Sequence, residues 1–103
     1  MTAFLFMSLS DGGNVLTTQL TIINKLGLHA RAAVKLVELA SRFDSDVVLV
    51  RGSRRVSGKS IMGVMMLAAS QGVTLDLVVD GSDEQEAQSS IALLVEQRFG
   101  EDV

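Results

Sequence analysis

The stretch from residue 30 to residue 42 repeats apolar and charged residues with the period of an α-helix. One side of this repeat is apolar and consists of Ala30, Ala33, Val34, Val37 and Ala40. The other side is a charged stripe made of Arg31, Lys35, Glu38 and Arg42. A segment with two such sides needs an apolar core beneath it. The pattern therefore predicts a surface helix of a globular domain.

The rest of the chain divides into strand-like and helix-like segments. Residues 16–23, 47–50 and 54–57 have the composition of strands, and residues 73–80 alternate apolar with mostly polar side chains. Helical patterns cover residues 60–69 and a final segment that runs to about Phe99, with Gly100 placed to end it. Ser82 and Gln85 predict a capping box at the start of that final helix, with Asp83 and Glu84 in its first turn.

The order of these segments restricts the topology. It reads strand, helix, strand, strand, helix, strand, helix. The turn at residues 52–53 joins the second and third strands, and so short a connection requires them to be antiparallel. The pattern predicts one four-stranded sheet that three helices cover on one face.

We expect one domain over residues 15–103, which is long enough to bury a core of its own. Residues 1–14 are apolar at first and then contain two glycines, so we interpret them as a flexible N-terminal extension. They lack the basic start and the cleavage site of a signal peptide. No apolar run approaches the roughly 20 residues that a membrane span needs. We expect a cytoplasmic protein without membrane insertion.

The composition excludes several classes of function. With no cysteine and one histidine, the chain offers neither thiolates nor a cluster of imidazoles to a metal ion. The net charge of −3 and the lack of Trp and Tyr are unfavourable for binding nucleic acid. Gly58, Lys59 and Ser60 look like the end of a P-loop, but Ser53 stands where that motif requires glycine. We expect no metal and no cofactor.

The only histidine, His29, directly precedes the predicted helix at residues 30–42. Free backbone N–H groups and the helix dipole favour an anion at such a position. A neutral imidazole there would be a nucleophile beside a phosphate site, and Arg31 could donate charge-assisted hydrogen bonds to phosphoryl oxygens. The simpler interpretations are that His29 is a polar residue near a helix start and that Arg31 belongs to a solvated charged face.

Two motifs make residues 17–100 resemble the HPr family, the histidine-containing phosphocarriers of the bacterial phosphotransferase system. The first is Asn-Lys-Leu-Gly-Leu-His-Ala-Arg at residues 24–31, and the second is Lys-Ser-Ile-Met-Gly-Val-Met-Met-Leu at residues 59–67. The family often has proline after the arginine, where this chain has Ala32. Members of the nitrogen-regulatory branch have alanine there, so this difference concerns the branch more than the chemistry.

The resemblance implies the fold and the reaction. The fold would be an α+β open-faced sandwich, a four-stranded antiparallel sheet with three helices on one face. His29 would accept a phosphoryl group on Nδ1 from Enzyme I, with phosphoenolpyruvate as the ultimate donor, and pass it to an enzyme IIA-type acceptor protein. Such a protein is a stoichiometric carrier, not an enzyme that turns over a substrate, and we expect it to be a monomer.

The second motif predicts a surface for partner proteins. The segment at residues 60–69 is apolar nearly all round, yet it is short, so we expect part of it to stay exposed. By resemblance and position, Ile61, Met62 and Met65 are the candidate contacts, although the same pattern fits a buried helix. Ser60 is either a helix N-cap or, as in some relatives, a site for an HPr kinase.

Two other functions fit the same residues. The chain could be a regulatory protein-binding module that phosphorylation of His29 or Ser60 switches. It could also be a small α+β ligand-binding domain without phosphotransfer. A phosphoryl group that leaves His29 for an acceptor distinguishes a carrier from a switched module, and any modification of His29 distinguishes both from a ligand-binding domain.

Overall fold

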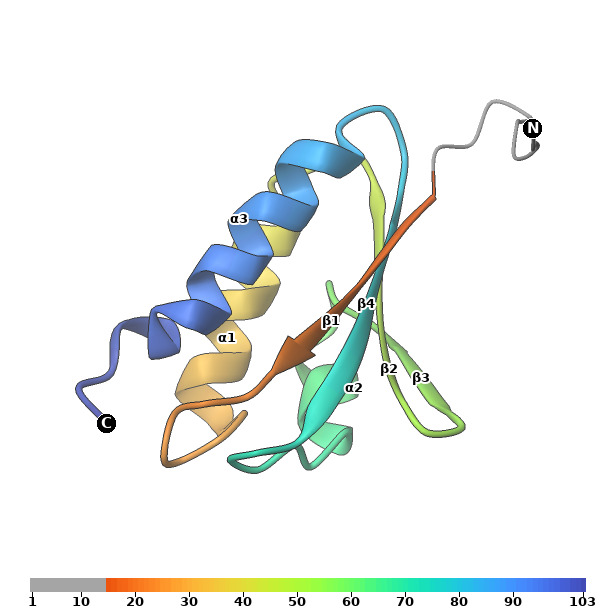
Figure 1. The fold of residues 1–103 in the computed structure, drawn as a ribbon. Helices are drawn as coiled ribbons and strands as arrows, with labels where there is room; N and C mark the ends of the chain where they lie inside the picture. The colour runs from red at the N-terminus through yellow and green to blue at the C-terminus, as the bar shows by residue number, and fades with distance from the viewer. Residues whose placement is uncertain (1–14) are drawn as a thin grey trace, which may run out of the picture.

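A four-stranded antiparallel sheet forms the framework of the protein (Figure 1), as seen in a computed structural model that describes residues 15–103. The strands are β1 (Leu16–Thr21), β2 (Asp46–Arg51), β3 (Arg54–Ser57) and β4 (Thr74–Asp80). They lie in the order β1-β4-β2-β3, so β4 is inserted between the first two strands. The expected extension at residues 1–14 lies outside the described residues.

Strand β4 supplies the centre of the core, as its alternating sequence predicts. Leu75, Leu77 and Val79 are buried on the face that the helices cover. Val79 pairs with Leu16 of β1 and with Val47 of β2, so both neighbouring strands are in register with it. The predicted antiparallel hairpin of β2 and β3 is also present, with a turn in which Gly52 has a positive φ of 60°.

The three helices are α1 (Ala30–Ala40), α2 (Ile61–Met66) and α3 (Glu84–Glu96), and the predicted α+β sandwich is confirmed. Figure 1 shows α1 and α3 side by side on one face of the sheet, with α2 next to β3. The apolar face of α1 is rotated from the predicted one. Ala30 is exposed and Val34 is half-buried, whereas Ala32 and Leu36 pack into the core.

The predicted capping box of Ser82 and Gln85 is wrong. Helix α3 begins at Glu84, and its N-cap is Asp83, whose side chain makes no capping bond. The Asp83 carboxylate instead accepts hydrogen bonds from the backbone N–H groups of Asp44 (2.9 Å) and Ser45 (3.0 Å) and from the Ser45 hydroxyl. Those bonds, led by the one from the hydroxyl, hold the pKa of Asp83 below its usual value. Asp83 therefore ties the start of α3 to the loop before β2.

Helix α2 is shorter than the predicted segment and is held at both ends. Ser60 caps its start, where the side-chain hydroxyl accepts a hydrogen bond of 3.0 Å from the N–H of Gly63. At the other end, Arg51 donates to the carbonyls of Leu67 (2.8 Å) and Ala68 (3.0 Å). Arg54 donates to the carbonyl of Met66. These bonds satisfy carbonyls that a helix end leaves without partners.

The C-terminal segment departs from the predicted continuous helix. Helix α3 ends at Glu96, and a 3-10 turn, η1 (Arg98–Gly100), follows. Arg98 and Phe99 both have a positive φ of 56°, a conformation that costs energy for residues with a side chain. Burial of Phe99 offsets this cost, because its ring is completely enclosed. Lys35 of α1 donates to the Phe99 carbonyl at 2.7 Å, so the chain turns back toward the start of α1.

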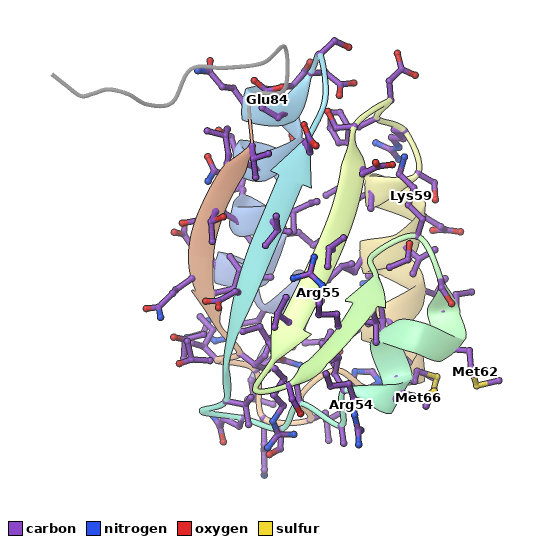
Figure 2. The ribbon with its side chains drawn as sticks, turned by 90° about the vertical axis from the view of Figure 1, so that its right-hand side faces the viewer. Arg54, Arg55, Lys59, Met62, Met66 and Glu84 are labelled. Atoms are coloured by element: carbon purple, nitrogen blue, oxygen red, sulfur yellow. The ribbon has the colours of Figure 1, made fainter. Side chains whose placement is uncertain are left out.

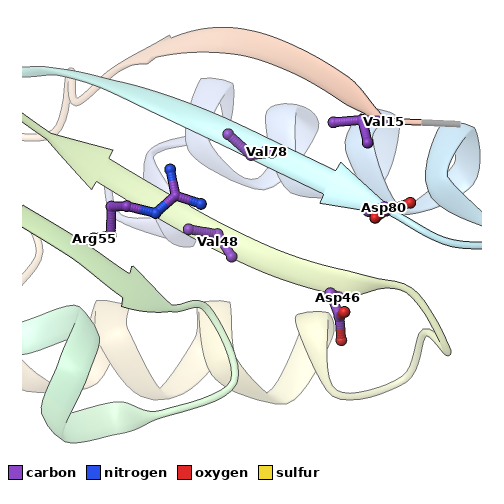
Figure 3. Close-up of a pocket in the computed structure, with 6 residues that line it drawn as sticks. All are labelled: Val15, Asp46, Val48, Arg55, Val78 and Asp80. Carbon is purple, nitrogen blue, oxygen red and sulfur yellow. The ribbon is translucent and has the colours of Figure 1, made fainter. Parts of the chain in front are cut away.

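Within residues 15–103, no helix covers the face of the sheet that faces away from α1 and α3 (Figure 2). It carries a shallow pocket of about 340 Å³ whose lining includes Val48, Val78 and Arg55, with Asp46 and Asp80 at one end (Figure 3). None of the helices within residues 15–103 is long and apolar enough to cross a bilayer.

Candidate functional site

His29 stands at the N-cap of α1, with φ −73° and ψ 178°. Its carbonyl accepts the first bond of the helix, from Ala33 N–H at 2.8 Å, while its side chain forms no cap. The amides of the first turn of a helix have no carbonyl partner within the helix, so they are available to an anion. The side chain is 26% exposed. The imidazole is therefore accessible and lies beside a group of free donors.

The imidazole meets the carboxylate of Glu101 from the C-terminal segment. Nε2 of His29 is hydrogen-bonded to Oε2 of Glu101, and this is the only contact between a basic side chain and a carboxylate that the structure shows within residues 15–103. The other carboxylate oxygen, Oε1, accepts a bond of 2.9 Å from Nδ2 of Asn24. Glu101 is only 14% exposed. Both of its oxygens are thus held within the site.

These contacts determine which ring nitrogen is free. The hydrogen bond from Asn24, followed by the one with His29, lowers the pKa of Glu101, so the carboxylate is ionised at neutral pH. An ionised carboxylate only accepts hydrogen bonds, so Nε2 of His29 must carry the proton that joins them. In the neutral ring, the lone pair then lies on Nδ1.

Asn24 organises the loop that presents His29. Its side chain is completely buried, and Nδ2 also donates to the carbonyl of Gly27 at 2.9 Å. The loop then approaches the segment after α2, where Leu28 N–H donates to the carbonyl of Ala69 at 2.8 Å. Gly27 has φ +69°, and a Cβ at this position would lie 2.6 Å from the Ala69 oxygen. The loop therefore requires glycine here for both conformation and space.

Arg31 lies in the first turn of α1 and is exposed. Within residues 15–103, the only contact between a basic side chain and a carboxylate joins His29 to Glu101. The guanidinium of Arg31 therefore has no carboxylate partner among these residues. Lys35, the next member of the predicted charged stripe, has a different role because its ammonium group donates a hydrogen bond to the carbonyl of Phe99. The stripe thus divides into a free arginine at the site and a lysine that anchors the C-terminal segment.

Helix α2 lies at the same end of the sheet as the loop before α1 (Figure 1). Val64 is fully buried, whereas three of its neighbours, Ile61, Met62 and Met65, are exposed. Met66, which sequence reasoning did not select, is also exposed. We call Ile61, Met62, Met65 and Met66 the α2 surface.

Sequence reasoning missed Asn24 and Glu101 as members of the site. Asn24 belongs to the recognised motif, but its role depends on burial, which the motif does not encode. Glu101 is 72 residues from His29 in the sequence, and no periodic pattern links positions so far apart. Within the described residues, no group of three or more potential metal ligands comes together.

The chain is similar in sequence to known proteins of one family. A family profile described as "PTS HPr component phosphorylation site" matches residues 16–97. The chain is 59% identical over 81 residues to phosphocarrier protein HPr of Cupriavidus necator, an alignment that covers 79% of this chain and 91% of the relative. Phosphocarrier protein NPr of Shewanella violacea is 45% identical over 86 residues, which cover 84% of this chain and 94% of the relative.

A solved structure shares the fold. HPr-C-His from Thermoanaerobacter tengcongensis superposes with a TM-score of 0.82 at 41% identity, and the match covers 85% of this chain and 99% of that chain. The family profile includes His29, Arg31 and Ser60, but it ends before Glu101.

We expect Gly27→Ala to destabilise the protein more than the matched variant Gly52→Ala. Both glycines have positive φ, so each alanine costs about 1–2 kcal/mol in backbone conformation. A Cβ at Gly52 meets nothing within 4 Å, whereas one at Gly27 overlaps the Ala69 oxygen and adds about 1–3 kcal/mol of overpacking. Chemical unfolding of both variants measures the difference. Equal losses would show that the loop can move away from Ala69.

Proposed function

Because the chain belongs to the HPr family, and is a phosphocarrier protein of the phosphotransferase system, we propose that His29 is the residue that carries the phosphoryl group. The observation that carries this assignment is the single accessible imidazole at the N-cap of α1, with Nε2 bonded to Glu101. It supports Nδ1 as the accepting atom, in agreement with the resemblance.

The transfer exchanges one bond to phosphorus for another. The Nδ1 lone pair attacks phosphorus, the N–P bond forms, and the bond to the donor protein breaks with its electron pair leaving on the donor. Because Nε2 keeps its proton, the imidazole becomes positively charged during the step. The Glu101 carboxylate stabilises that charge, in the way that a buried carboxylate stabilises a catalytic histidine in hydrolases. Passage to an acceptor reverses the same steps.

The phosphoryl oxygens need donors that are already in position. The free amides of the first turn of α1 and the unpaired guanidinium of Arg31 can supply them. Arg31 is exposed, so it interacts more weakly than a buried arginine would. This suits a carrier, which must release the group that it accepts.

The α2 surface is the proposed contact for partner proteins. Its apolar side chains are exposed, and helix α2, which carries them, lies at the same end of the sheet as the loop before α1 (Figure 1). The proposed partners are Enzyme I as donor and an enzyme IIA-type protein as acceptor, which are components of the system that the family serves. The protein would act as a monomer in the cytoplasm, where those partners operate.

A second function, a switched binding module, is favoured by the position of Ser60. Its hydroxyl caps α2 directly before the α2 surface, and the residue is only half-buried. A phosphate there would keep the favourable helix-end position while adding about 1.5–2 negative charges beside Ile61 and Met62. An HPr kinase would be the partner. Loss of docking without loss of fold in Ser60→Asp would support this function.

We expect incubation with phosphoenolpyruvate and a cognate Enzyme I to add one phosphoryl group to the protein. The label should be acid-labile and base-stable, because it is attached to a ring nitrogen, and His29→Ala should accept none. Intact-mass measurement before and after acid treatment gives the result. Acid-stable label, or label that persists in His29→Ala, would assign the group to another residue. Adding the acceptor should then remove the label, which a switched module would retain.

We expect Arg31→Ala to keep the fold and slow phosphoryl transfer, by at most the 10²–10³-fold (order of magnitude) that one electrostatic donor contributes at a dedicated enzyme site. Arg42→Ala is the matched control, because Arg42 is exposed at the far end of the same stripe. Rapid-quench kinetics with labelled Enzyme I compares the two variants. Identical transfer rates would show that Arg31 belongs only to the solvated charged face of α1 and does not bind the phosphoryl group.

We expect Glu101→Gln to slow acceptance of the phosphoryl group. We also expect the free energy of unfolding of this variant to fall less steeply than that of the wild type as the pH is lowered. The pKa of Glu101 is lowered in the folded protein, so its stabilising contribution is complete above the unfolded value near 4.5 and is lost as pH falls toward the lowered value. Unfolding followed between neutral pH and strongly acidic pH tests this. The control is Glu96→Gln at the exposed end of α3. A variant profile that still falls like the wild type would mean that other carboxylates dominate.

A further inference from the structure

All three methionines within residues 15–103 lie in α2, and all three are exposed. The exposed fraction is 71% for Met62, 56% for Met66 and 42% for Met65. Figure 2 shows Met62 and Met66 projecting away from the sheet. We propose that these three methionines are a reversible oxidation site, at which a hydroperoxide converts the thioethers to sulfoxides and weakens docking through the α2 surface. This inference rests on the proposed use of that surface.

The composition of the chain leaves its methionines as the side chains that a peroxide oxidises most readily. There is no cysteine, tryptophan or tyrosine, so the chain has no thiol that would react with peroxide first. Of the five methionines, three lie within the six residues of α2. Their side chains need no unfolding to become accessible.

The reaction is balanced without any further reagent. The sulfur lone pair attacks the outer peroxide oxygen, the O–O bond breaks with its electron pair on the departing oxygen, and the proton of the attacked oxygen passes to that departing oxygen. The transferred oxygen stays on sulfur as a sulfoxide, and the remainder leaves as water or an alcohol. Sulfur is oxidised by two electrons and the peroxide is reduced by two. Methionine sulfoxide reductases reverse the change in cells, so the modification can act as a switch.

The fold around α2 does not depend on the exposed methionines. The helix is anchored by Val64 and Leu67, which are buried, and by the cap at Ser60. Arg51 and Arg54 hold its C-terminal end through backbone carbonyls, which oxidation does not alter. A sulfoxide therefore changes the chemistry of the α2 surface and leaves its position unchanged.

Docking would respond strongly to this change. A thioether is apolar and adaptable, which suits a surface that meets two partners in turn. A sulfoxide oxygen placed against an apolar partner loses its water without gaining a hydrogen bond. We expect oxidation to weaken binding to Enzyme I by roughly ten-fold or more.

The test treats the full-length protein with hydrogen peroxide and removes the excess with catalase. Trypsin separates the two groups of methionines, since residues 60–98 form one fragment and residues 1–25 contain Met1 and Met7. Mass spectrometry should show up to three added oxygen atoms on the 60–98 fragment, first at Met62. Calorimetric titration with Enzyme I should show weaker binding, and sulfoxide reductases should restore it.

The matched control is the triple variant Met62→Leu, Met65→Leu, Met66→Leu, which keeps the volume and apolar character of the surface. It should bind Enzyme I normally and stay insensitive to peroxide, although Met1 and Met7 remain. Loss of binding by the oxidised triple variant would overturn the inference, as would an unmodified 60–98 fragment.

A further variant, Met62→Asp, separates this inference from the proposed function. If Met62→Asp binds weakly but the oxidised wild type binds normally, the α2 surface docks and the oxidation switch is wrong. If Met62→Asp also binds normally, the proposed docking surface is wrong, and the switch is wrong with it.

Discussion

The buried amide of Asn24 connects the parts of the chain on which the site depends. Through one nitrogen it binds the Gly27 carbonyl in its own loop and the Glu101 carboxylate from the far end of the sequence. Glu101 in turn holds His29. A buried N–H donor costs free energy when it has no acceptor, so the loop and the C-terminal segment must come together for Nδ2 to be satisfied, whereas Oδ1 of the same amide is buried without a partner. The orientation of the imidazole follows from that requirement, because Glu101, which Asn24 holds, is bonded to Nε2 of His29.

The fold could be predicted well because its elements have clear periods. The alternation in β4 specifies its burial almost residue by residue, whereas the repeat of α1 predicts the helix but places its buried face slightly off the observed one. The errors occur where tertiary contacts override local signals. Asp83 does not cap α3 with its side chain because it binds the loop before β2, and the chain after Glu96 turns away because Phe99 enters the core. Neither contact leaves a local pattern in the sequence.

The residues of the candidate site were likewise predictable only in part. His29, Arg31 and Ser60 could be selected because they lie in two short motifs, and the cap at Ser60 is present. The roles of His29 and Arg31, and phosphorylation of Ser60, remain predictions. Glu101 could not be selected, since its only link to the motif is spatial. The exposure of the α2 surface was predictable from the shortness of the segment, but the arginine contacts at its end were not. An isolated helix of this length would not be stable in water, so those contacts are what allow so apolar a helix to remain on the surface.

The two edges of the sheet have a consequence for association between copies of the protein. Among the described residues, strands β1 and β3 each pair on one side only, so their outer backbone groups could template another strand. Strand β3 has only four residues and begins with Arg54 and Arg55, whose charges oppose stacking against a second β3. Strand β1 presents Thr17, Gln19 and Thr21 to solvent and offers little apolar surface to an incoming strand. Such edges disfavour the sheet extension that leads to aggregation, so the chain can expose two strand edges and still resist pairing with other copies of itself.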